Sequence, residues 1–338
     1  MSEPVISVTP LSFPWPTMDP FIFCVHHLDR YPAGNGDFGP SASLEGRNIG
    51  QDFSIKDGWR MYHGSKVPGF PAHPHSGFET VTIARQGFID HSDSLGAAGR
   101  FGEGDVQWMT AGQGVQHCEM FPLIKTDKAN TTELFQIWLN LPAVSKSVPA
   151  HFKMLWADSV PKVTIADSRG KNTHLEIIAG SFNGHRAPAP NPDSWAANSE
   201  NEVAIWTLRM EPGAVIELPV ASNRAKRCLY FFDGESVAIS GQNFVPGYRI
   251  QVHASEVTRI ENGPQECQFL LLQGVPIGEP VVQYGPFVAN TQEEIRQILS
   301  SYQRTQFGGW PWPDYENVHR EATGKFAKYP DGRTEVPA

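Results

Sequence analysis

Short apolar runs, separated by glycine, proline, asparagine and aspartate, recur along most of the chain. Several of these runs have the length and the β-branched or aromatic content of strands: 78–84, 106–110, 134–140, 175–180, 203–210, 228–232 and 268–272. Many short strands with frequent turn formers are typical of a β-sandwich or β-barrel. We therefore expect an all-β protein.

One segment near the C-terminus has the periodicity of a helix instead. Its apolar residues are spaced i, i+3, i+4 and i+7 and should pack on a core: Ile295, Ile298, Leu299 and Tyr302. Thr291 and Glu294 form a potential capping box at its start. The residues after 307 are rich in glycine, proline and charge, which predicts an extended arm laid on the surface or partly mobile.

The length and composition indicate two domains. With 338 residues the chain can bury two cores, and its 31 glycines and 28 prolines fit an all-β protein better than a helical one. The two halves are weakly similar, each with a Pro-Gly turn, a short strand, a spacer and an apolar strand, as two copies of one barrel would be. We expect one domain over 1–145, a second over 146–307 and a C-terminal extension over 308–338.

The charge and the cysteines limit the partners and the compartment. Asp and Glu outnumber Lys and Arg by 36 to 27, a balance that argues against direct binding of nucleic acid. The sequence has no apolar run of membrane-spanning length and no signal-peptide pattern at its start. Its four cysteines are scattered without a CxxC, which favours a reducing compartment. We expect the cytoplasm, and a nuclear location is also compatible with the sequence.

Two pairs of residues carry the metal-binding chemistry. His73 and His75 form one pair, and His117 and Glu119 form the other. Residues i and i+2 of a strand point to the same face, so each pair can direct two ligand atoms into one cavity. Imidazole nitrogens with one carboxylate suit a divalent transition metal such as Fe(II), Mn, Ni, Cu or Zn. Spacing alone leaves Glu79 as a rival ligand.

The residues around these pairs predict the walls of the site. His63 precedes the first pair closely and is a candidate for supporting the ligands from behind. An aromatic-lined pocket over the metal would suit a flat aromatic substrate, although each wall residue could equally belong to a barrel core. The wall candidates are Phe53, Phe70, Phe78, Trp108 and Met109.

Several blocks resemble the pirin branch of the cupin superfamily: HPHSGFETVTI, DVQWMTAGQGVQHCEM and FLLLQGVPIGEPVVQYGPFVANTQEEI. The resemblance covers most of residues 15–307. It implies a bicupin, with two antiparallel jelly-roll barrels, a short C-terminal helix and an extended C-terminal arm.

The resemblance also implies how the metal is held. The N-terminal barrel would hold one metal, usually iron, with Mn, Ni, Co, Cu or Zn as alternatives, and the second barrel would be metal-free. Carried over by residue, the ligands are His73, His75, His117 and Glu119. Glu79 is not a ligand in pirins, so it takes a structural or supporting role.

Two functions are compatible with this resemblance. Some pirins resemble quercetin 2,3-dioxygenases, which open the ring of a flavonol with O₂, and Glu119 would then be the general base. Other pirins are redox-sensitive iron-binding regulatory proteins that act through protein partners, in transcription or in a metabolic enzyme complex. In both cases metal binding requires neutral imidazoles and should weaken below about pH 6.

Overall fold

The computed structural model describes residues 4–337, which form two compact β-rich units. The N-terminal barrel unit contains Val25–Ala157 and the residues from Glu279 onward. The C-terminal barrel unit contains Asp158–Gly278 and the residues up to Cys24. Each domain predicted from the sequence is a single continuous segment, with boundaries at 145/146 and 307/308. Each unit of the structure instead combines two segments, because the outermost segments pair with strands far away in sequence.

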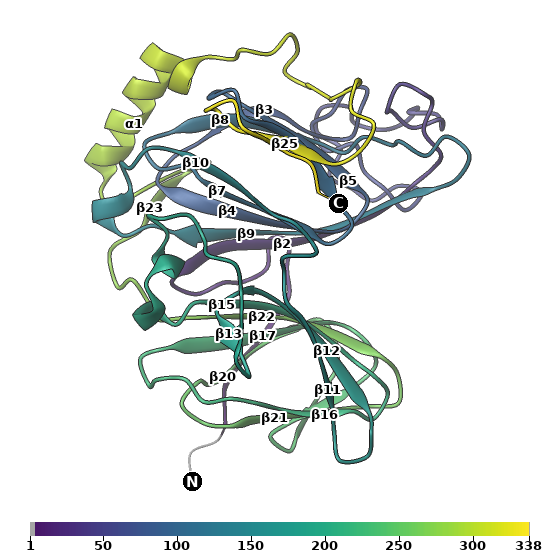
Figure 1. The fold of residues 1–338 in the computed structure, drawn as a ribbon, viewed down its shortest axis with the longest axis vertical. Coiled ribbons are helices and arrows are strands. Elements are labelled where there is room, and N and C mark those ends of the chain that lie inside the picture. Colours follow the sequence, from purple (N-terminus) through teal and green to yellow (C-terminus); the bar gives the residue numbers. More distant parts are fainter. Residues whose placement is uncertain (1–3, 338) are drawn as a thin grey trace. The chain divides into compact units, whose positions relative to one another are not determined.

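The N-terminal barrel unit is built of two antiparallel sheets (Figure 1). One sheet has the order β10 (His151–Leu155), β7 (Asp105–Thr110), β4 (Phe78–Gln86), β9 (Asn130–Asn140) and β2 (Phe21–Tyr31). The other has the order β26 (Thr334–Glu335), β25 (Phe326–Lys328), β6 (Ala98–Gly102), β5 (Phe88–Asp93), β8 (Val115–Met120) and β3 (Gly69–His75). A hairpin joins β23 (Val282–Tyr284) and β24 (Phe287–Ala289).

The C-terminal barrel unit repeats this design with its own strands. The larger sheet has the order β1 (Val5–Pro10), β20 (Tyr248–His253), β17 (Lys226–Asp233), β22 (Cys267–Gly274), β15 (Ala204–Met210), β12 (Asn172–Ala179) and β11 (Lys162–Ala166). The smaller has the order β16 (Val215–Leu218), β21 (Thr258–Asn262), β18 (Val237–Ile239) and β19 (Gln242–Phe244). A short hairpin joins β13 (Ser181–Phe182) and β14 (His185–Arg186).

Each unit has an apolar core of its own. Phe101, Phe121 and Leu134 belong to a buried cluster in the N-terminal barrel unit. Trp206 and Phe231 belong to the corresponding cluster in the C-terminal barrel unit. The predicted apolar runs lie in β4, β7, β9, β12, β15, β17 and β22, which confirms both the strands and the all-β class.

The predicted helix is confirmed as α1 (Gln292–Thr305). The Thr291 side chain accepts from the backbone N–H of Glu294, and the Glu294 carboxylate accepts from the N–H of Thr291, which completes the capping box. The apolar face of the helix packs against Phe287 and Phe307. Short 3-10 turns lie at Ala143–Ser145, Trp195–Ala197, Ser199–Asn201 and Gln306–Gly308. Within residues 4–337, no helix is long and apolar enough to cross a membrane.

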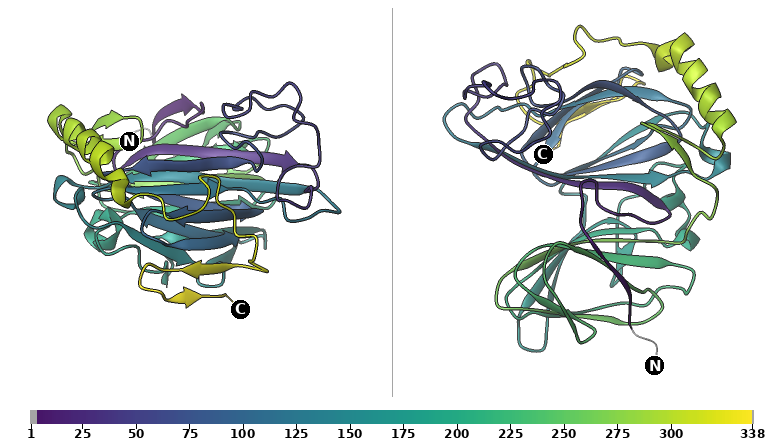
Figure 2. Two further views of the ribbon diagram at one scale, coloured as in Figure 1. Left: turned by 90° about the horizontal axis from the view of Figure 1, so that it is seen from above. Right: turned by 180° about the vertical axis from the view of Figure 1, so that it is seen from behind.

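The C-terminal arm is integrated into the fold more closely than the sequence predicts. Its strand β25 pairs with β6 and extends the sheet that carries β8 and β3 (Figures 1 and 2). The Arg100 guanidinium, which forms an ion pair with Asp90 at 2.7 Å, also donates to the backbone carbonyls of His319 and Ala322 in the arm. Trp312 Nε1 donates to the carbonyl of Asp93 at 2.8 Å. These bonds hold the arm in place along the sheet.

Candidate metal centre

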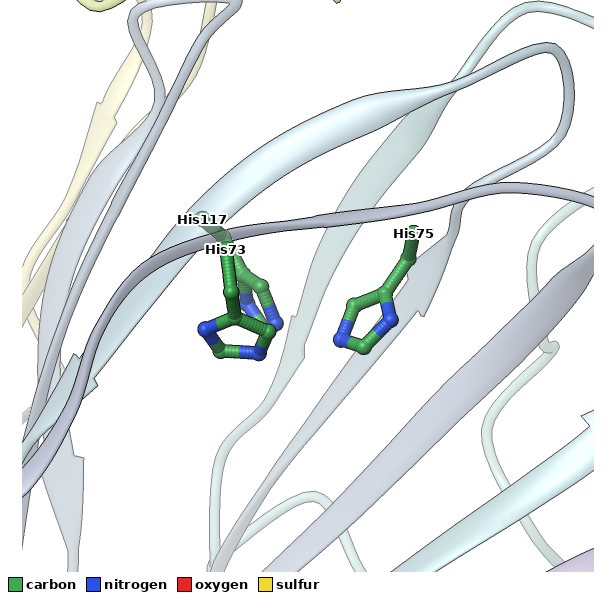
Figure 3. Close-up of side chains that lie close together, drawn as sticks. All are labelled: His73, His75 and His117. Carbon is green, nitrogen blue, oxygen red and sulfur yellow. The ribbon is translucent and has the colours of Figure 1, made fainter. Parts of the chain in front are cut away.

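Three histidines converge from two paired strands. His73 on β3 lies directly opposite His117 on β8, and His75 follows two residues later on the same face of β3. Figure 3 shows the three rings directed toward one another, and one ligand nitrogen from each lies within 4.8 Å of the other two. Pro74, between the first pair, cannot donate to a sheet ladder, and β3 is the edge strand of its sheet as this residue requires.

Burial sets the protonation of these rings. His117 is fully buried and His75 is 2% exposed. Desolvation lowers the pKa of both well below the ordinary value of 6.5. Desolvation also lowers the pKa of His73 to about 4, although the carbonyl of Pro71 at 2.8 Å from Nδ1 favours the proton. The rings are therefore neutral at and well below neutral pH, with lone pairs available to a metal, so protonation should weaken metal binding only at a lower pH than the value of about 6 expected from the sequence.

The arrangement fits a bound metal ion. Among the described residues, neither ring nitrogen of His117 has a hydrogen-bond partner, and both are buried. Neither nitrogen of His75 makes a hydrogen bond of good geometry there, although the Pro286 carbonyl is near enough to favour a proton on this ring. Buried polar atoms without a partner destabilise a fold. A cation between the rings would bind one nitrogen of each ring, and His73, His75 and His117 form the group within residues 4–337 that could hold a metal ion.

Glu119 lies beside the three histidines but is held by other residues. Its Oε2 is 3.9 Å from His117 Nε2. Thr82 Oγ1 and Gln136 Nε2 each donate to its carboxylate at 3.1 Å. Desolvation raises its pKa above the ordinary value, and the bond from Gln136 partly opposes that shift. The predicted pairs are thus brought to one place, with three members close together and the carboxylate adjacent.

Glu79 faces another part of the barrel. Its carboxylate accepts hydrogen bonds from Trp108 Nε1 at 3.1 Å and from Thr110 Oγ1 at 2.7 Å. Because Thr82 faces Glu119 and strand residues alternate between faces, Glu79 lies on the opposite face of β4. The i+4 spacing from His75 does not apply here, since β3 ends at His75 and a new strand begins at Phe78.

The proposed aromatic wall is only partly assembled at the cluster. The Phe78 ring lies 5.1 Å from that of His75, and the Phe70 ring lies 6.3 Å from that of His73. Phe53 is one ring further out, 6.4 Å from Phe70, and is 38% exposed.

The remaining wall candidates, Trp108 and Met109, are adjacent on β7 and so point to opposite faces. Met109 is opposite Thr80 and shares the inner face of the sheet with it, whereas Trp108 is directed to Glu79. His63 approaches the site through aromatic contacts: its Nδ1 is 2.7 Å from the Gly50 carbonyl, and its ring packs on Phe53 at 4.9 Å.

Sequence reasoning missed several residues of this site. His91 is fully buried on β5, with its ring 5.4 Å from that of His117. The Trp138 ring lies 5.4 Å from that of His75. Thr82 and Gln136 were also missed, although both are polar residues inside otherwise apolar strand runs, a signal that could have identified them. Most buried residues of this kind have a polar partner.

Comparisons with known proteins identify related chains and a related fold. The family model "Pirin" matches residues 41–139, and "Pirin C-terminal cupin domain" matches residues 205–308. A Pseudomonas aeruginosa protein whose name proposes a quercetin 2,3-dioxygenase is 33% identical, over 71% of this chain and 79% of its own length. Pirin-1 of Arabidopsis thaliana is 34% identical, over 71% of this chain and 78% of its own. The crystal structure of a quercetin 2,3-dioxygenase from Acinetobacter baumannii is similar with a TM-score of 0.70 and 25% identity, over 90% of this chain and 98% of that one.

Proposed function

The chain belongs to the pirin family of cupin-domain proteins, and we propose that it is a metal-dependent dioxygenase that cleaves flavonols such as quercetin with O₂. The observation that carries the proposal is the convergence of the ligand nitrogens of His73, His75 and His117 within 4.8 Å. These three histidines, together with Glu119, would hold one divalent transition metal, most often Fe(II). The A. baumannii neighbour, by its title a quercetin 2,3-dioxygenase, supports the substrate class.

A bound metal of this kind would supply Lewis acidity for the reaction of the flavonol with O₂. The protein's own part is to prepare the site for them. Burial keeps the three imidazoles neutral, so they do not repel a cation.

Glu119 is suited to accept the proton of the flavonol hydroxyl. Its raised pKa makes its carboxylate a stronger base than an exposed one. Thr82 and Gln136 orient that carboxylate with one hydrogen bond each. A flat aromatic substrate would lie against Phe78 and Trp138, whose rings are 4.3 Å apart beside His75.

The test is turnover of quercetin by the purified chain. The metal-free protein is loaded in turn with Fe(II), Mn, Ni, Co, Cu or Zn, quercetin is added in air, and the flavonol absorbance is followed while metal content is measured on the same samples. We expect loss of the flavonol with at least one metal, and loss of that activity in His117→Ala. The matched control is His253→Ala, at the half-buried last residue of β20, and this variant should retain the activity.

A chain that binds one metal without turning over any flavonol would contradict the dioxygenase proposal. It would favour the alternative function, a redox-sensitive iron-binding regulator. That alternative is tested by capturing protein partners with the oxidised and the reduced metal-loaded protein, and identical partner sets would contradict it.

A further inference from the structure

The C-terminal barrel unit contains a buried cation that the proposed function does not use. Arg227 on β17 is 1% exposed. It shares a strand face with Leu229 and Phe231, both of which belong to the apolar core, so its side chain enters the barrel interior. A buried arginine of this kind requires strong partners for its guanidinium.

The partners of Arg227 satisfy only part of its guanidinium. Its Nε donates to Gln273 Oε1 at 2.8 Å, and its Nη2 donates to the Pro219 carbonyl at 2.7 Å. Its Nη1 is buried and has no hydrogen-bond partner among the described residues. Glu202 is the carboxylate that acts on its charge, but the oxygens of Glu202 accept hydrogen bonds from Ser222. Desolvation lowers the pKa of Arg227 to about 10, so it is still a cation at neutral pH.

The Arg227 side chain is part of the wall of a cavity of about 890 Å³, which Glu202 also lines. The volume is in the range of sites for small organic molecules. One side of the wall is apolar, with Trp206 from the barrel and three prolines from the proline-rich segment 185–203. The lining residues that matter here are Arg186, Pro188, Pro190, Trp206, Arg227 and Gln273.

We infer that this cavity binds a small organic acid whose carboxylate accepts a hydrogen bond from Arg227 while its apolar body lies against Trp206 and the proline-rich segment. The free donor and the positive charge favour an anionic acceptor over a neutral one, because hydrogen bonds between charged groups are the stronger ones. Glu202 lines the same cavity and already acts on the charge of Arg227, so a monoanionic carboxylate buries less unbalanced negative charge here than a dianionic phosphate. This site is separate from the histidine cluster and does not depend on a metal.

The position of the cavity agrees with the design of the N-terminal barrel. β16 pairs with β21 as β3 pairs with β8, and Pro219 directly follows β16. Arg227 therefore lies next to the end of the strand that corresponds to the histidine-bearing β3. Corresponding strands therefore carry the candidate metal ligands in one unit, on β3, and lie beside the proposed anion-binding arginine in the other, at the end of β16.

The first test uses the wild-type chain and three matched probes. 4-Fluorobenzoate, its neutral analogue 4-fluorobenzamide and 4-fluorophenyl phosphate are titrated into the metal-free and the metal-loaded protein, with binding followed by ¹⁹F NMR. We expect the acid to bind at least about tenfold more tightly than the amide, as the loss of one charge-assisted hydrogen bond predicts, and no less tightly than the phosphate. Its affinity should be the same with and without metal.

The second test places the bound acid. Arg227→Gln should weaken 4-fluorobenzoate at least about tenfold, whereas Arg186→Ala on the exposed rim should weaken it only a few-fold. If Arg227→Gln does not fold, the wild-type chain is crystallised with 4-bromobenzoate. The inference then requires the anomalous bromine signal to lie in this cavity. Equal binding of acid and amide, tighter binding of the phosphate, affinity unchanged in folded Arg227→Gln, or bromine elsewhere would overturn the inference.

Discussion

The two barrel units share a core of strand pairings and differ in the residues that their inner faces carry. β17 pairs with β22 in one unit as β4 pairs with β9 in the other, and both pairings are antiparallel. In the C-terminal unit the strands β16 and β21 contribute Ile216, Leu218 and Ile260 to an apolar core. In the N-terminal unit the strands β3 and β8 present histidines and a carboxylate instead. The framework therefore does not determine the chemistry, which depends on a few inward positions.

A polar barrel interior needs hydrogen-bond partners for its buried side chains, whereas an apolar interior does not. In the N-terminal unit the side-chain amide of Gln107 is fully buried, and neither its oxygen nor its nitrogen has a hydrogen-bond partner among the described residues. It occupies the same row as Thr82 and Gln136, which hold Glu119. Buried groups of this kind are stable where water or a ligand completes them. This row is thus consistent with an interior that admits small molecules beside the histidines.

The largest expected difference between the units concerns metal binding. His117→Ala removes one of three converging nitrogens, so metal content should fall from about one ion per chain to below about a tenth of that. His174→Ala in the other unit should leave it unchanged. Metal analysis after dialysis measures both, and a full metal load in His117→Ala would contradict the assignment of the site.

Core truncations test whether the two units are independently packed. Phe101→Ala and Phe231→Ala each remove a fully buried ring and should lower the free energy of unfolding by about 3–5 kcal/mol. Phe231→Ala should leave metal content unchanged, because its cluster contains none of the histidines. Denaturant unfolding with metal analysis of the folded fraction checks this, and loss of metal in Phe231→Ala would show that the units are coupled.

Acid should destabilise the N-terminal unit before the C-terminal unit. The folded-state pKa of His73 is about 4 and that of His27 is about 3, both lowered by burial from 6.5. Below pH 6.5 the unfolded chain binds protons that the folded chain does not, so the free energy of unfolding decreases as the pH falls. The slope is about 1.4 kcal/mol per pH unit for each such histidine, until each folded-state pKa is reached.

Hydrogen exchange on the metal-free protein at a series of pH values measures this difference. Peptides from β3, β4 and β8 should lose protection between pH 6.5 and about 4, and peptides from β17 and β22 should lose less. The reverse order, or equal loss in both units, would contradict the expected role of the buried histidines.

The smallest expected effect concerns the support of Glu119. Gln136→Leu removes a donor to a buried carboxylate and should cost about 1–3 kcal/mol of stability and weaken metal binding by about 10- to 100-fold. Gln268→Leu, on the outer face of the C-terminal unit, is the matched control and should change neither quantity appreciably. Thermal unfolding and competition with a chelator measure both, and an unchanged metal affinity in Gln136→Leu would contradict a supporting role for this residue.

Local sequence patterns were sufficient to predict the strands, the helix and the residue pairs that lie within one strand or helix. The capping box of α1 and the i, i+2 spacing of His73 with His75 involve neighbours in sequence, so the geometry of one helix or strand decides them. The same holds for Cys118, which alternation directs away from the histidines and whose sulfur lies 3.6 Å from the Asn317 carbonyl. The blocks shared with pirins then indicated the bicupin fold.

Residue spacing did not predict neighbouring side chains where the chain turns between strands or where a strand distant in sequence pairs with the sheet. The turn at Ser76 and Gly77 separates His75 from Glu79, so residues in apparent register belong to different strands. His91 is buried because β5 pairs with β8 and β6, and the arm is ordered because β25 pairs with β6 more than two hundred residues away.

The sequence by itself determined the strands, the helix, the two pairs of candidate ligands and the family to which the chain belongs. Tertiary structure decided that the pairs meet, that Thr82 and Gln136 rather than the histidines hold Glu119, and that Arg227 lines a cavity. The physical reason is that the direction of a side chain follows from its own strand, whereas its partner depends on which strand is placed opposite. That placement is settled by burial of the whole apolar surface, which no short window of sequence contains.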